Sequence, residues 1–90
     1  MASDIDRKKL WGRAGSRCAM CNCELTRVNQ VDSIIGDEAH IRARRVGGPR
    51  HDPSYPVRKL NTYENLVLLC KIHHKLVDDN EEVFTTATLV

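Results

Sequence analysis

The chain has 90 residues, which are enough for one domain with a modest hydrophobic core. A net charge of +2 says little about partners. Because only 4% of the residues are aromatic and the core is small, we expect added stabilisation, such as a bound metal. No apolar stretch approaches the roughly 20 residues of a membrane helix, and the polar start up to Lys9 lacks the apolar segment of a secretory signal. We therefore expect a cytoplasmic protein rather than a membrane-spanning or a secreted one.

The first predicted element is a helix near the N-terminus. Ser3 or Asp4 can cap its start, and Gly15 fits its end. Residues 18–23 follow with three cysteines, and this spacing is typical of a tight turn of the zinc-knuckle type.

The middle of the chain predicts a strand and then a long loop. Residues 34–44 have strand propensity, with a turn expected at Gly36. Residues 45–62 are rich in glycine and proline and predict an irregular loop, which is long for so small a domain and is often functional in such cases. Six basic residues but a single acid lie between Arg42 and Lys59, a balance that suits a polyanionic ligand. A solvated loop with incidental charge is the alternative.

The last third predicts a strand, a helix and a second strand. Residues 66–69 read as a buried strand, residues 71–77 as a short helix, and residues 84–90 as a strand because they are rich in threonine and valine. We expect the helix to turn three apolar side chains inward: Ile72, Leu76 and Val77.

Two pairs of potential metal ligands lie far apart in the sequence: Cys18-x-x-Cys21 and Cys70-x-x-His73. Two such pairs can close one tetrahedral zinc site, and without a secretory signal the spacing favours metal over disulfides. Cys23 in place of Cys21, and His74 in place of His73, remain alternatives. Four protein ligands leave no open coordination position, so the predicted role of this zinc is structural.

Five segments carry a resemblance to a known family. They are LWGRAGSRC at residues 10–18, GDEAHIRAR at 36–44, GPR at 48–50, and YENLVLLC with HHKLVD between 63 and 78. In these segments the chain resembles the HNH endonuclease family, and within it a bacterial subset with the motifs LWGRAxGRC, GExAHIxAR…GPR and ENLxLLCxxHHxxxD. The resemblance runs from about residue 8 to about residue 80, so residues 1–90 are predicted to form a single HNH nuclease domain.

The resemblance implies an α+β fold of the ββα-metal type, here zinc-stapled and preceded by the N-terminal helix. It also implies catalytic roles for three residues. His40 resembles the general base that activates water, Asn65 the residue that holds the loop and so orients that histidine, and His74 a ligand of a catalytic Mg²⁺, Mn²⁺ or Ni²⁺. An imidazole with a pKa of ~6.5 suits proton abstraction near neutral pH, and a cation neutralises charge on the scissile phosphate.

The chain departs from the family at one position. Many HNH enzymes carry an aspartate directly before the first histidine, as a cation ligand, where this chain has Ala39. The second cation ligand is therefore unassigned, with three candidates: Asp37, Glu38 and Asp52. The basic loop supplies the predicted nucleic-acid contacts, which are Arg42, Arg44 and Arg50.

The resembling subset implies a DNA endonuclease of bacterial antiphage defence. Its members often form the N-terminal module of effectors in which a C-terminal sensor domain binds a cyclic oligonucleotide and drives assembly. We therefore expect DNA as the substrate, a regulatory sensor domain and a homo-oligomer as further partners, and no membrane partner. Two other hypotheses remain: a zinc-stapled nucleic-acid-binding module without turnover, and a zinc ribbon for protein contacts. The discriminating feature is His40 with Asn65 and His74, because binding alone does not require them.

Overall fold

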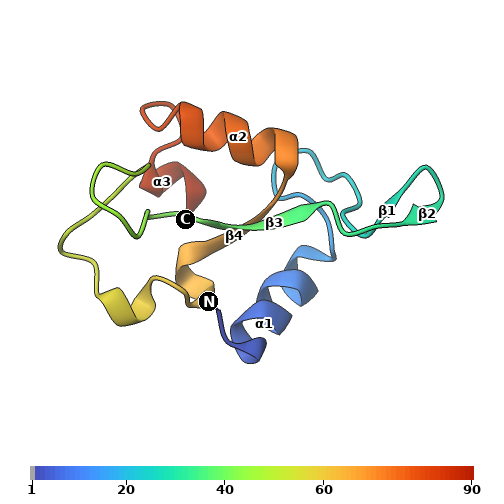
Figure 1. Ribbon diagram of the computed structural model, residues 1–90, viewed down its shortest axis with the longest axis horizontal. Coiled ribbons are helices and arrows are strands. Elements are labelled where there is room, and N and C mark those ends of the chain that lie inside the picture. The colour runs from blue at the N-terminus through green and yellow to red at the C-terminus, as the bar shows by residue number, and fades with distance from the viewer. Residues whose placement is uncertain (1) are drawn as a thin grey trace.

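The computed structural model describes residues 2–90. In chain order the elements are α1 (Asp4–Ala14), β1 (Arg27–Val28), β2 (Val31–Asp32), β3 (Gly36–His40), the 3₁₀ helices η1 (Val57–Lys59) and η2 (Tyr63–Asn65), β4 (Leu66–Cys70), α2 (Lys71–Asp79) and α3 (Thr86–Leu89). They make a small α+β fold in which α1 and α2 lie on either side of the β3–β4 ribbon (Figure 1). Among the described residues, no helix is long and apolar enough to cross a membrane.

Helix α1 begins and ends as its sequence predicts. The Ser3 side chain accepts a hydrogen bond from the Asp6 N–H at 3.2 Å, which satisfies one of the free donors of the first turn. Gly15 ends the helix in the left-handed region, with φ of 63°, where glycine has no steric penalty. Leu10 is buried and joins the helix to the core.

The central ribbon pairs β3 with β4 in antiparallel register, from Gly36 opposite Cys70 to His40 opposite Leu66. Gly36 is the first residue of β3, so the predicted turn at this position is wrong. A Cβ there would lie 2.9 Å from Leu25 Cδ1 and 3.0 Å from Trp11 Cη2. Glycine is therefore required by the close approach of α1 and the Leu25 side chain, and not by a turn.

The core lies where the ribbon meets both helices. Its most deeply buried side chains come from β4, α2 and the segment before β1: Leu25, Leu68, Leu69 and Val77. The prediction that Ile72 and Leu76 face inward is wrong, since they are 73% and 45% exposed. Val77 alone of the three turns inward, because α2 directs the face that carries residues 73 and 77 at the ribbon.

The C-terminal segment forms a helical turn where the sequence predicts a strand at residues 84–90. The Thr85 side chain accepts from the Thr88 N–H at 3.3 Å and caps α3, while the Asn80 carbonyl accepts from the N–H of Phe84 at 2.9 Å. Phe84 packs against the core from this turn. Local capping and one apolar anchor therefore outweigh strand propensity, which depends on pairing with a neighbouring strand.

A shared carboxylate fastens α1 to β3. Glu38 Oε2 accepts from Arg7 Nε at 2.9 Å and from Trp11 Nε1 at 2.8 Å. Burial alone would raise the pKa of Glu38, but the hydrogen bonds from Arg7 and Trp11 outweigh it, so the net shift of the pKa is downward. A carboxylate with a depressed pKa stabilises the fold above its unfolded pKa of ~4.3, and the contribution is lost as pH falls through the folded value.

We therefore expect Glu38→Gln to lower the free energy of unfolding by about 1 kcal/mol at pH 7, after allowing for solvent screening of the exposed Arg7. The deficit should shrink at pH 3, where the wild-type carboxylate is itself being protonated. Urea unfolding at both pH values measures it, with the exposed Glu82→Gln as the matched control. An equal deficit at both pH values would show that the charge of Glu38 does not matter.

Candidate functional site

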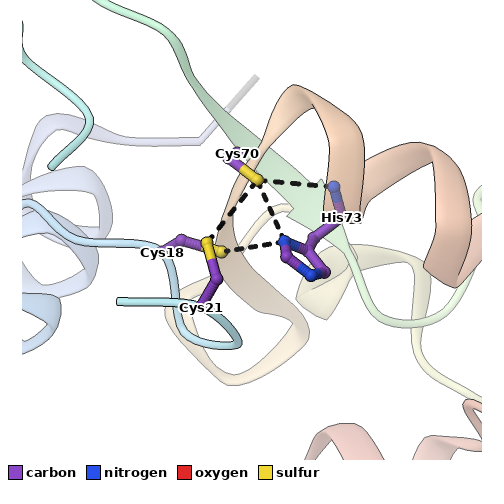
Figure 2. Close-up of side chains that lie close together, drawn as sticks. All are labelled: Cys18, Cys21, Cys70 and His73. Atoms are coloured by element: carbon purple, nitrogen blue, oxygen red, sulfur yellow. Dashed lines mark hydrogen bonds between the residues drawn. The ribbon is translucent and has the colours of Figure 1, made fainter. Parts of the chain in front are cut away.

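Three cysteines and one histidine meet where the turn at residues 18–23, here called the N-terminal turn, lies against β4 and α2: Cys18, Cys21, Cys70 and His73 (Figure 2). Their ligand atoms all lie within 4.8 Å of one another. The Cys21 and Cys70 Sγ atoms are 4.0 Å apart, and Nδ1 of His73 is 3.9 Å from Cys18 Sγ. Tetrahedral zinc with Zn–S bonds of ~2.3 Å sets ligands about 3.8 Å apart, so the group can hold a metal ion such as zinc. It contains Cys21 rather than Cys23, and His73 rather than His74.

Backbone geometry brings each pair of ligands together. The Cys18 N–H donates to the Cys23 carbonyl at 3.0 Å and closes the N-terminal turn, and the Ala19 N–H donates to the Leu68 carbonyl at 2.9 Å, which fastens this turn to β4. Cys70 is both the last residue of β4 and the N-cap of α2, where its Sγ accepts from the His73 N–H at 3.4 Å. The Cys-x-x-His spacing is therefore a cap followed by the first helical turn.

The protonation of the thiols distinguishes Cys18 from Cys23. Burial alone would raise the pKa of Cys18, but N–H groups of Cys21, Cys70 and Met20 stabilise its thiolate and lower the pKa to about 6. The neighbouring Cys21 side chain is the main reason that the pKa of Cys23 is raised to about 11. Burial raises the pKa of Cys70 as well, so the positions of the ligand atoms, and not the pKa, separate Cys23 from the four-residue group.

His40 and His74 line the same surface cleft, which has a volume of about 540 Å³. His40 is the last residue of β3, and His74 comes from α2 together with Asp78. Arg44 and Arg45 line the cleft from the loop that follows β3, and both are exposed. The cleft thus combines two imidazoles, two guanidinium groups and two carboxylates, those of Glu38 and Asp78.

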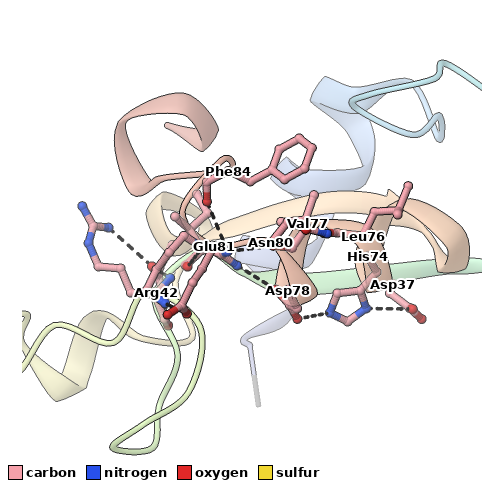
Figure 3. A network of polar contacts seen from close by, with 12 residues as sticks. Asp37, Arg42, His74, Leu76, Val77, Asp78, Asn80, Glu81 and Phe84 are labelled. Carbon is pink, nitrogen blue, oxygen red and sulfur yellow. Dashed lines mark hydrogen bonds and ion pairs between the residues drawn. The ribbon is translucent and has the colours of Figure 1, made fainter.

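The His74 ring lies between two carboxylates (Figure 3). Its Nδ1 is 2.9 Å from Asp37 Oδ2, and its Nε2 is 3.1 Å from Asp78 Oδ2. Burial alone would raise the pKa of Asp37, but Lys71, at 2.7 Å, and His74 reverse the shift and lower it. A histidine that ligates a metal commonly has its other ring nitrogen held by a carboxylate, and Asp37 occupies that position here.

The carboxylate that lies beside Nε2 of His74 is none of the three candidates of the sequence. Glu38 is bound to Arg7 and Trp11, Asp52 Oδ1 accepts from the Ser54 N–H at 2.9 Å within its own loop, and Asp37 lies on the Nδ1 side of His74. Asp78, which the sequence analysis did not select, lies beside Nε2 in the cleft. Its i,i+4 spacing from His74 on one helix was the signal that could have found it.

His40 has an unexpected partner. Its Nε2 lies 2.7 Å from Asn61 Oδ1. With that oxygen as acceptor, Nε2 carries the proton and Nδ1 keeps the lone pair that a general base needs. Asn61 lies in the loop before η2 and belongs to none of the motifs, so the sequence offered no signal for it.

Asn65 is the buried polar side chain of the described core. Its Nδ2 donates to the carbonyls of Arg42 at 3.1 Å and Leu60 at 3.0 Å, and its Oδ1 accepts from the Arg42 N–H at 2.9 Å. These bonds join the chain just after His40 to the chain just before β4. That Asn65 in this way orients His40 for catalysis stays a prediction.

The three arginines predicted to bind nucleic acid have different surroundings. Arg44 is exposed at the cleft, and the half-buried Arg42 lies over the Tyr55 ring, with its guanidinium carbon 4.1 Å from the ring centroid. Arg50 is only 4% exposed, and its guanidinium donates to three backbone carbonyls and to Asp78. This placement does not support the predicted phosphate contact of Arg50, since four hydrogen bonds already hold its guanidinium within the fold.

No protein-family model matches the chain, and the search of curated proteins found no match either. The motif resemblance and the geometry above are therefore the grounds on which a function can be proposed.

Proposed function

We propose that this domain is a cation-dependent HNH endonuclease that hydrolyses DNA phosphodiester bonds, and that it is the nuclease module of a bacterial antiphage effector. One observation carries the proposal: His40 and the His74–Asp78 pair line one cleft, beside two exposed arginines. A structural role for either histidine would not require them to share a cleft. The sensor domain and the assembly of several copies are proposed from the motif resemblance alone.

The order of the elements around the cleft supports a ββα-metal arrangement. An antiparallel ribbon, β3 with β4, leads directly into α2 (Figure 1). His40 is the last residue of β3, and His74 lies in the first turns of α2. The end of β4 that lies away from His40 is joined to the turn at residues 18–23 by the four-residue group of Cys18, Cys21, Cys70 and His73. We infer that zinc there supports the scaffold while the cleft carries the chemistry.

The cleft residues can divide the work of hydrolysis. Nδ1 of His40 would take a proton from water as its oxygen attacks phosphorus and the bond to the leaving oxygen breaks. Arg44 and Arg45 would bind the flanking phosphates. His74 and Asp78 would hold a divalent cation, and their nitrogen and oxygen donors fit Mn²⁺ or Ni²⁺ as well as Mg²⁺. When bound, that cation supplies neutralisation of charge on the phosphate and the leaving oxygen.

Asn61 should matter for turnover if His40 is the base. Asn61→Leu removes the acceptor for the Nε2 proton, so the imidazole can rotate or adopt the other tautomer. We expect the single-turnover rate of DNA cleavage to fall about tenfold or more, with little change in DNA affinity. An unchanged rate would show that this hydrogen bond has no part in catalysis. Asn61→Asp, which keeps an acceptor oxygen, is the matched comparison.

Cleavage and binding of one labelled duplex test the proposal against a module that only binds. Zinc-loaded protein is used without chelator, because a chelator would also strip the structural site. We expect nicks only when Mg²⁺, Mn²⁺ or Ni²⁺ is added, and we expect His74→Ala to bind the duplex with wild-type affinity but not to cut it. Binding without cleavage under every cation would favour the zinc-stapled binding module, to which the exposed Arg44 and the Arg42–Tyr55 stack are equally suited.

A further inference from the structure

The buried Arg50 side chain is the centre of a polar network, and three of its partners, Val77, Asp78 and Phe84, are labelled in Figure 3. Its Nε donates to the Ile41 carbonyl at 2.6 Å, just beyond β3, and its Nη1 donates to the carbonyls of Val77 at 3.1 Å and Phe84 at 3.3 Å. One guanidinium therefore joins the ribbon, the end of α2 and the C-terminal turn. The backbone at Arg50 has a φ of 56°, a left-handed conformation that a non-glycine residue adopts at a cost.

The same guanidinium reaches the cleft through one carboxylate. Arg50 Nη2 donates to Asp78 Oδ1 at 2.7 Å, and the other oxygen of that carboxylate lies 3.1 Å from His74 Nε2. The three carbonyls fix the plane of the guanidinium, so its fourth bond fixes the rotation of the Asp78 carboxylate. One oxygen is thereby held inside the fold, and the other is presented beside His74.

We propose that Arg50 is a positioning residue for the cation site, acting through Asp78 to hold its free oxygen and His74 Nε2 in place. The inference rests on the proposed function, since it concerns the same cation. It replaces the phosphate contact predicted for Arg50 with a role inside the fold. It also explains why the charge of Arg50 is buried, since a buried ion pair by itself adds little stability to a small domain.

Lysine at this position tests the geometry while keeping the charge. Its ammonium donors radiate from one point on a flexible stem, so it cannot serve three carbonyls and a carboxylate at once. Loss of a hydrogen bond that holds a metal ligand in place typically weakens metal binding about 10- to 100-fold. We therefore expect Arg50→Lys to raise the dissociation constant for Mn²⁺ by that factor, with cleavage partly restored at high Mn²⁺.

The test measures Mn²⁺ binding to zinc-loaded protein by electron paramagnetic resonance. It compares wild type, Arg50→Lys, Asp78→Asn and the double variant, with the core variant Leu25→Ala as a control for destabilisation alone. If Arg50 acts through Asp78, the double variant should bind Mn²⁺ within about twofold of Asp78→Asn, because effects on one pathway do not add. Leu25→Ala should lower the melting temperature and leave the Mn²⁺ constant unchanged.

The outcomes separate this inference from the proposed function. Mn²⁺ binding that His74→Ala weakens but Arg50→Lys does not would overturn the role of Arg50 and leave the cation site standing. Binding that His74→Ala does not affect would overturn both. If Arg50→Lys does not fold, Glu81→Ala serves instead, because it releases only the Arg50 N–H that donates to Glu81 Oε2 at 3.1 Å. That variant should weaken Mn²⁺ binding several-fold, and no change would overturn the inference.

Discussion

Replacing Cys70 by alanine is expected to leave the chain unfolded at room temperature. Cys70 ends β4, caps α2 and contributes one of the four metal-ligand atoms, while being only 8% exposed. Structural zinc contributes an apparent binding free energy of about 10–16 kcal/mol in small domains, which is as large as the whole stability of an ordinary domain. Circular dichroism, together with the zinc content of the purified protein, measures the loss.

Cys23→Ala is the matched control for that experiment. Cys23 lies two residues from Cys21 and is half-buried, but it is outside the four-ligand group. The variant should retain about one zinc per chain and melt within a few degrees of wild type. A Cys70→Ala protein with an unchanged melt would refute the structural role of the metal, and zinc loss in Cys23→Ala would show that the ligand set is different.

The second large effect is expected on catalysis. His40→Ala should slow DNA cleavage by about 10²- to 10⁴-fold, the usual contribution of a general base, while DNA affinity and the melting temperature stay close to wild type. The fold should tolerate the change because His40 is only half-buried at the end of β3, and its side-chain hydrogen bond is to the loop residue Asn61. Single-turnover cleavage and fluorescence anisotropy with the same duplex separate rate from binding.

His51→Ala provides a histidine control in the neighbouring loop. Nδ1 of His51 lies 3.2 Å from the Ala43 carbonyl, and the ring does not line the cleft. This variant should keep most of the activity. Full activity in His40→Ala would show that His40 is not the base. Equal losses of activity in His40→Ala and His51→Ala would point to damage of the loop instead.

Local signals in the sequence predicted much of the scaffold. The capping serine, the glycine after α1 and the apolar run before Cys70 each depend on neighbours in the chain, and the structure contains the corresponding helix and strand. The two pairs that form the Cys18, Cys21, Cys70 and His73 group were predictable for the same reason, since each pair lies within one turn. Such features need no knowledge of which distant segments meet.

The sequence failed where distant contacts decide the outcome. Phe84 packs against the core from a helical turn, and this contact adds to the local cap at Thr85, although the residues there favour a strand. The buried position of Arg50 and the Asn61 bond to His40 depend on how the loop between β3 and β4 folds back. No spacing within one turn encodes these contacts.

Relaxation of supercoiled plasmid by the zinc-loaded domain tests the central claim most directly. Wild type is incubated without added cation, and with Mg²⁺, Mn²⁺ or Ni²⁺, at protein concentrations high enough to favour assembly, with His40→Ala beside it. The proposal predicts nicked circles, since one site cuts one strand, only for wild type and only with added cation. Plasmid that stays supercoiled under every cation, although a gel shift shows it bound, would contradict the assignment of this domain as a nuclease.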